Sequence, residues 1–157
     1  MSANLCVVFD IDDTLYLERD YVRSGFAAVG AWVKKWLGVD DFPATAWALF
    51  EQGRRGDIFD EALRQAGVEP NPDLVRSLVS LYRCHRPAIA LLPDASRCLE
   101  DLRERAAIAV VSDGPAVSQT RKAEALGLDK LAHPLIFTEL WGAEFRKPHT
   151  RAFETVQ

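Results

Sequence analysis

The stretch from Leu5 to Tyr16, LCVVFDIDDTLY, places the strongest constraint on what this chain can fold into. It opens with an apolar, β-branched run, and we expect a strand over Leu5–Phe9 that is buried on both faces. The run ends in Asp10, Asp12 and Asp13. Like charges this close repel one another, so the cluster favours a bound cation or a carboxyl that keeps its proton. Side chains two apart share a face, so Asp10 and Asp12 are predicted to address one ligand while Asp13 points elsewhere.

The spacing of these acids and the threonine that follows is the first functional signal. The pattern Asp-x-Asp-x-Thr after an apolar strand, here Asp10, Asp12 and Thr14, resembles the first motif of the haloacid dehalogenase-like (HAD) superfamily. The resemblance implies a Mg²⁺-dependent phosphatase, the activity of most members. The competing interpretation is an Asp-rich turn that carries no chemistry.

Composition narrows the class of partner. With 157 residues of which 48% are hydrophobic, the chain can fill a sizeable core. A net charge of −4 provides no basic face for nucleic acid or an anionic membrane, so neither is predicted as a partner. The first residues form no basic leader and no stretch has transmembrane length, which predicts a cytoplasmic location. A phosphorylated ligand must therefore find local positive charge.

The three cysteines, Cys6, Cys84 and Cys98, are odd in number and lack the spacing of metal ligands. We predict that they are small buried hydrophobes in a reducing compartment. The adjacent Cys84 and His85 could bind a metal, but no second pair of ligands is in view, so this interpretation is not favoured.

Residues 18–86 are predicted to form a bundle of four helices. The first is amphipathic and ends before Gly38; the second runs from Pro43 to near Gly53, the third is capped by Asp57, and the fourth ends at Pro87. In the superfamily that the chain resembles, an all-helical cap inserted after the first motif closes the active site and reads the substrate. The alternative is that these helices only pack on one another.

Two groups of side chains in this cap could contact a ligand. Arg54 and Arg55 present planar forks that suit phosphate or carboxylate, although solvated arginines are commoner. The tryptophans at helical spacing are predicted to fill the cap core or its interface rather than to stack on a ligand, namely Trp32, Trp36 and Trp47.

After the cap, an α/β alternation begins. A helix that starts near Pro93 precedes a predicted strand, Ile108–Val111, which ends in Ser112, Asp113 and Gly114. A helix over residues 115–126 follows, so this turn offers amide groups and a positive dipole end to an anion. It resembles the second HAD motif, which implies that the Ser112 hydroxyl and the amides of Asp113 and Gly114 hold phosphoryl oxygens. An ordinary turn or helix cap is the alternative.

The last motif candidate is Lys147, which follows a short predicted strand, Leu135–Phe137. Lys147 before Pro148 resembles the third HAD motif, a lysine that neutralises the phosphoryl group and steadies the nucleophile. Pro148 is expected to hold Lys147 extended and to open the following helix.

These elements predict an α/β, Rossmann-like three-layer sandwich with a mainly parallel sheet and an inserted α-helical cap. The predicted core is discontinuous, residues 1–17 and 87–157, and the cap is residues 18–86. A fourth acidic motif, which completes the Mg²⁺ site in the superfamily, has no counterpart before Gln157, so the C-terminal part of the core is expected to be missing. The first strand would then present an apolar edge that could support a homodimer.

The resemblance implies phosphomonoester hydrolysis through an aspartyl-phosphate, with a sugar phosphate or nucleotide as the small phosphorylated metabolite. Asp10 would be the nucleophile, Asp12 the acid and base, and Lys147 the charge partner; Thr14, Ser112, Asp113 and Gly114 would shape the phosphate site, and Asp10 with Asp12 would hold Mg²⁺. Three alternatives remain open. They are an inactive fragment or partner-binding module, a metal-independent dehalogenase, in which Asp12 would have no use, and a phosphomutase.

Overall fold

The computed structural model describes residues 5–156, and the chain divides into two compact units. One unit comprises residues 1–21 and 86–157, and the other is the continuous segment Val22–His85. The boundaries predicted from the sequence fall after residues 17 and 86.

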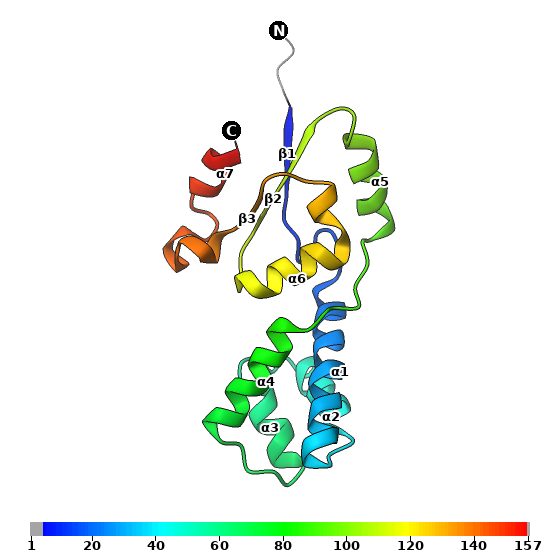
Figure 1. The fold of residues 1–157 in the computed structure, drawn as a ribbon, viewed down its shortest axis with the longest axis vertical. Coiled ribbons are helices and arrows are strands. Elements are labelled where there is room, and N and C mark those ends of the chain that lie inside the picture. Colours follow the sequence, from blue (N-terminus) through cyan, green and yellow to red (C-terminus); the bar gives the residue numbers. More distant parts are fainter. Residues whose placement is uncertain (1–4, 157) are drawn as a thin grey trace. The chain divides into compact units, whose positions relative to one another are not determined.

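The first unit contains a parallel sheet of three strands in the order β1-β2-β3, and these are β1 (Cys6–Phe9), β2 (Ala107–Ser112) and β3 (Leu135–Phe137) (Figure 1). All three lie within one residue of the predicted strands. In the register Phe9 pairs with Val110 and Ser112 with Phe137, so the carboxyl ends of the three strands meet at one edge of the sheet. The α/β, Rossmann-like fold class is thereby confirmed.

Three helices flank this sheet: α5 (Pro93–Leu102), α6 (Ala116–Leu126) and α7 (Arg151–Val156). The side chain of Ala152 on α7 packs with Val111 and Ile136 on one face. Right-handed crossovers between parallel strands place α5 and α6 on the opposite face, which gives three layers. Short 3₁₀ turns complete the unit, namely η1 (Leu128–Lys130), η2 (Thr138–Trp141) and η3 (Ala143–Phe145).

Strand β1 departs from its prediction of burial on both faces. Cys6 is exposed, and Val7, Val8 and Phe9 are half-buried, whereas the central strand β2 is buried from Ile108 to Ser112. The reason is position, because β1 lies at an edge of the sheet that the described residues form.

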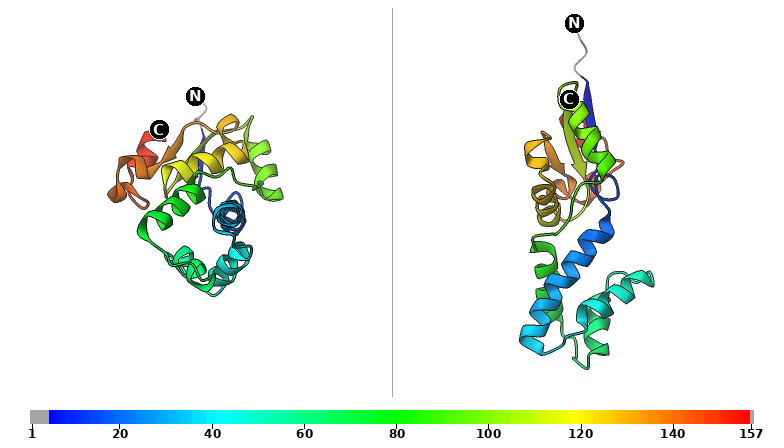
Figure 2. Two further views of the ribbon diagram at one scale, coloured as in Figure 1. Left: turned by 60° about the horizontal axis from the view of Figure 1, so that its bottom comes forward. Right: turned by 90° about the vertical axis from the view of Figure 1, so that its right-hand side faces the viewer.

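The second unit is a helical bundle built from α1 (Glu18–Leu37), α2 (Phe42–Glu51), α3 (Ile58–Gln65) and α4 (Pro72–Cys84). Figure 2 shows these helices in two further views, and the ring of Phe26 on α1 lies 5.9 Å from that of Tyr82 on α4, measured between centroids. One apolar cluster joins all four helices and includes Val29, Val33 and Leu63, each with no exposed surface. The four helices occur where the sequence predicted them.

Three local predictions in this unit and its surroundings are wrong. Asp57 makes no capping hydrogen bond, because its carboxylate instead pairs with Arg54. Trp36 is 62% exposed, since it lies toward solvent at the end of α1. The cysteines are also exposed and are not core residues: Cys6 is on the edge strand, and Cys84 and Cys98 are on helix faces turned away from the buried stripe.

Candidate active site

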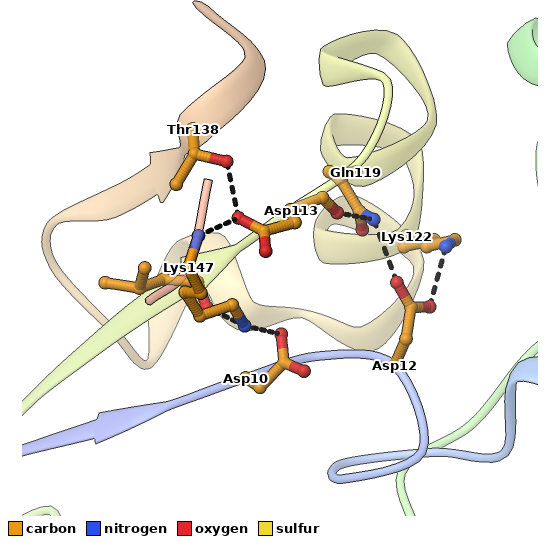
Figure 3. Close-up of polar contacts among 8 residues, drawn as sticks. Asp10, Asp12, Asp113, Gln119, Lys122, Thr138 and Lys147 are labelled. Carbon is orange, nitrogen blue, oxygen red and sulfur yellow. Dashed lines mark hydrogen bonds and ion pairs between the residues drawn. The ribbon is translucent and has the colours of Figure 1, made fainter. Parts of the chain in front are cut away.

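The carboxyl ends of β1 and β2 bring a carboxylate and an ammonium group together. Asp10 directly follows β1, and the Nζ of Lys147 lies 2.9 Å from its Oδ1 (Figure 3). The same Nζ donates to the carbonyl oxygen of Val111 on β2, at 3.2 Å. Both charged side chains keep some exposure, 37% for Asp10 and 27% for Lys147, so a ligand can reach them.

Asp113 connects the loop after β2 with the segment that carries Lys147. Its Oδ1 accepts a hydrogen bond from the hydroxyl of Thr138 at 2.5 Å and another from the backbone N–H of Lys147 at 3.3 Å. The carboxylate of Asp113 therefore holds the backbone at Lys147, a task that sequence reasoning did not assign to it. Pro148 does not open the next helix, because α7 begins only at Arg151.

Ser112 is the last residue of β2, and its hydroxyl oxygen is buried with no hydrogen-bond partner among the described residues. Burial of an unpaired hydroxyl is unfavourable, so this atom is suited to meet a ligand oxygen. Gly114 follows with a φ of +107°, and a Cβ there would lie 2.9 Å from the Nε2 of Gln119. Only glycine fits this turn without displacing Gln119.

The first amide of α6, just beyond the turn predicted to bind phosphate, already has an acceptor. The N–H of Ala116 donates to the Oε2 of Glu139, at 2.7 Å. This carboxylate occupies part of the positive end of α6.

Asp12 does not point toward Lys147 with Asp10; its carboxylate faces α6 (Figure 3). Its Oδ1 accepts hydrogen bonds from Lys122 at 2.6 Å and from the hydroxyl of Tyr16, and its Oδ2 accepts one from Gln119 at 2.8 Å. Burial acts to raise the pKa of Asp12, but the charge of Lys122 and these hydrogen bonds outweigh it and hold the pKa below its usual value. Asp12 is therefore ionised at neutral pH.

The loop between β1 and α1 sends its remaining polar side chains elsewhere, as predicted for Asp13. Asp13 has a left-handed φ of 51°, and its Oδ1 accepts a hydrogen bond from the backbone N–H of Glu18, at 2.8 Å. Thr14 is exposed, and its N–H donates to the carbonyl of Ile11. Both residues shape the loop that presents Asp12.

The structure thus places Asp10 and Lys147 in contact and Asp113 beside them, with Ser112 at the end of the neighbouring strand. Sequence reasoning missed Tyr16, Thr138, Gln119 and Lys122. Gln119 and Lys122 lie on the buried face of α6 with Ser118, Ala123 and Leu126, a burial that their residue types do not predict.

The other side chains considered as ligand-binding candidates have partners within their own unit. Arg54 donates two hydrogen bonds to the carboxylate of Asp57, and Arg55 donates one to the carbonyl oxygen of Phe50. His85 is buried, and its ring nitrogens lie 2.5 Å from the carbonyl oxygen of Tyr82 and 3.2 Å from the hydroxyl of Ser24. These contacts account for His85 structurally.

Mg²⁺ finds only part of a site in these residues. Within residues 5–156, no three His, Cys, Asp or Glu side chains are grouped as metal ligands. The Asp10 carboxylate is half-exposed and can supply one oxygen, and Mg²⁺ commonly takes one or two carboxylates together with water and substrate phosphate. The Asp10 carboxylate is therefore a suitable ligand for Mg²⁺.

The structure is an α/β core with a carboxylate and a lysine in contact at the strand ends and a helical insertion after the first strand. The family profile of haloacid dehalogenase-like hydrolases matches residues 5–156, and the chain belongs to this family. A glyceraldehyde 3-phosphate phosphatase from Methanopyrus kandleri is 30% identical over 158 aligned positions, which cover 94% of this chain and 66% of the relative. The chain thus spans just under two thirds of that protein's length.

Solved structures agree on the fold. A magnesium-bound HAD hydrolase from Bacillus subtilis superposes with a TM-score of 0.62 at 18% identity, over 98% of this chain and 71% of that one. A predicted phosphoglycolate phosphatase from Haemophilus somnus gives 0.58 at 20% identity, covering 98% and 69%. L-2-haloacid dehalogenase from Xanthobacter autotrophicus gives 0.54 at 20% identity, covering 98% and 64%. Across residues 5–156, no helix has the length and apolar character needed to cross a membrane.

Proposed function

We propose that this chain carries the catalytic apparatus of a Mg²⁺-dependent phosphatase that hydrolyses a small phosphomonoester through an aspartyl-phosphate on Asp10. The observation that carries the proposal is the 2.9 Å contact between Asp10 and Lys147. It lies next to the strand that ends in Ser112, whose buried hydroxyl has no hydrogen-bond partner within residues 5–156. A carboxylate becomes a workable nucleophile toward phosphate when nearby cations offset the negative charge of both groups.

In the proposed reaction, an Asp10 oxygen forms a bond to phosphorus while the bond from phosphorus to the ester oxygen breaks. The leaving oxygen takes a proton, and water then attacks the aspartyl-phosphate, which releases inorganic phosphate and restores the Asp10 carboxylate. Lys147 offsets charge on the transferring group, and the Ser112 hydroxyl with the Asp113 and Gly114 amides holds its oxygens. Thr14 contributes by shaping the loop.

Asp12 serves in this scheme as the group that protonates the leaving oxygen and later deprotonates water. Its ionised state in the ligand-free protein suits the second task directly. For the first, Asp12 must take up a proton once the substrate phosphate adds negative charge beside it.

Mg²⁺ would be held by the Asp10 carboxylate and the Asp12 backbone carbonyl. When bound it supplies positive charge that neutralises phosphate oxygens. The magnesium in the Bacillus subtilis structure supports this assignment for a protein of the same fold.

The substrate class is proposed as a small phosphorylated metabolite, a sugar phosphate or a nucleotide. The name of the Methanopyrus relative favours a three-carbon or similarly small phosphate ester.

The helical unit is proposed to act as the cap that recognises this substrate. The exposed edge of β1 is proposed as a surface through which two copies of the chain associate.

The test is hydrolysis of p-nitrophenyl phosphate by the Asp10→Asn variant in the presence of Mg²⁺. The substitution keeps the shape of the side chain and removes the nucleophilic oxygen charge, so turnover should fall to the buffer rate. Asp13→Asn is the matched control, because Asp13 points to the Glu18 amide and Asn tolerates its positive φ. Equal activity in Asp10→Asn and the parent chain would refute the mechanism.

A further inference from the structure

Lys122 is a buried cation that the proposed mechanism does not use. It lies on α6 and is 4% exposed. Its Nζ is 2.6 Å from the Oδ1 of Asp12 and 4.4 Å from the centroid of the Tyr21 ring, with the Tyr16 ring at 6.0 Å. A buried ammonium is unfavourable unless it is paired and hydrogen-bonded, so the contact with Asp12 is what permits this burial.

Gln119, one turn earlier on α6, fixes the other oxygen of the same carboxylate. Its Nε2 donates to the Oδ2 of Asp12 at 2.8 Å and to the carbonyl oxygen of Asp113 at 2.6 Å. The carboxylate of Asp12 is therefore held at both oxygens from one helix, and that helix is also tied to the loop after Ser112. Rotation of Asp12 away from this orientation would break several bonds at once.

The two acids of the first motif thus have separate counter-charges, Lys147 for Asp10 and Lys122 for Asp12. Two carboxylates on one loop repel each other, and each would otherwise compete for the same lysine. Because each carboxylate has its own lysine, the two are held in different orientations.

We propose that Lys122, together with Gln119, is a positioning residue for the phosphatase reaction: the pair fixes the orientation in which Asp12 exchanges a proton with the leaving oxygen. This inference rests on the proposed function. It predicts that loss of Lys122 lowers kcat/KM most for those substrates whose leaving group needs a proton. p-Nitrophenolate is a stable anion and departs readily without a proton, whereas the alkoxide of an alkyl phosphate does not.

The experiment compares kcat/KM of the full chain and its Lys122→Met variant on p-nitrophenyl phosphate and on glycerol 2-phosphate. kcat/KM reports the phosphoryl-transfer step, and the loss on the alkyl ester should exceed the loss on the aryl ester by about tenfold or more. Lys122→Arg keeps the charge and should recover part of the difference. Lys130→Met, the same change at an exposed lysine, should leave both substrates unaffected.

Gln119→Leu provides a second variant if Lys122→Met does not fold. It removes the other side chain that holds the Asp12 carboxylate, and it leaves no charge unpaired. It should show the same preference for the aryl ester. Equal losses on both esters in the variants that fold would overturn the positioning role. Absence of hydrolysis in the parent chain would instead overturn the proposed function. The contact of Lys122 with Asp12 would then be tested by a double-mutant unfolding cycle of Lys122→Met and Asp12→Asn, in which a lack of coupling would show that Lys122 does not hold Asp12.

Discussion

The carboxylate of Asp113 accepts a hydrogen bond from the hydroxyl of Thr138, and the same oxygen accepts the backbone N–H of Lys147. Thr138 has no exposed surface and follows β3, so this contact ties the end of β3 to the end of β2. The segment bearing Lys147 is therefore positioned through Asp113, and the lysine reaches Asp10 from a backbone that is already fixed.

Thr138→Val keeps the shape of the side chain and removes the donor to Asp113. Because the remaining carboxylate oxygen is left partly unsatisfied, we expect a loss of about 1–3 kcal/mol in the free energy of unfolding, measured by urea titration. Thr138→Ser should retain most of the stability, and Thr155→Val, at an exposed helix position, should change it little. A Thr138→Val protein as stable as its parent would show that the contact contributes nothing.

Metal removal separates the proposed phosphatase from a hydrolytic dehalogenase. EDTA should abolish release of p-nitrophenol from p-nitrophenyl phosphate, and added Mg²⁺ should restore it, since positive charge at the phosphate is needed beyond that of Lys147. Chloride release from 2-chloropropionate, followed in the same samples, should be absent. Chloride release that persists in EDTA would establish the dehalogenase alternative.

The ion pair of Asp12 and Lys122 should make stability depend on pH in a defined direction. Asp12→Asn leaves the buried ammonium unpaired, so at pH 7 we expect it to cost about 3–5 kcal/mol. The folded pKa of Asp12 is lowered, so the unfolded chain takes up the proton first as pH falls. The stability gap between parent and variant should therefore narrow as the pH falls below about 3.9, the usual pKa of an aspartate in an unfolded chain.

Urea unfolding of both proteins at a series of pH values measures this gap. A constant difference between pH 7 and pH 3 would contradict the assignment of the pair.

The parallel core was predictable because each strand has two signals in the sequence, an apolar run and the polar residues that follow it. Asp10, Ser112 and Lys147 were found from these positions together with a family resemblance, and the structure brings Asp10 and Lys147 into contact. The burial of β1 was overestimated, since an apolar run does not reveal whether a strand is central or at an edge.

Lys122 and Gln119 were not found for a different reason. Their importance depends on the rotation of α6 relative to the loop that carries Asp12, and helical periodicity alone assigns a lysine to the solvent side. Asp57 shows the same limit on a smaller scale: its residue type predicts a cap, but a nearby arginine, Arg54, takes its carboxylate.

The buried hydroxyl of Ser112 has a thermodynamic consequence for the stability of the fold. Replacing serine by alanine would remove this desolvated polar atom, so we expect the fold to be at least as stable with alanine at position 112. In the proposed reaction, a phosphoryl oxygen that accepts a hydrogen bond from this hydroxyl would recover the free energy lost by burying it.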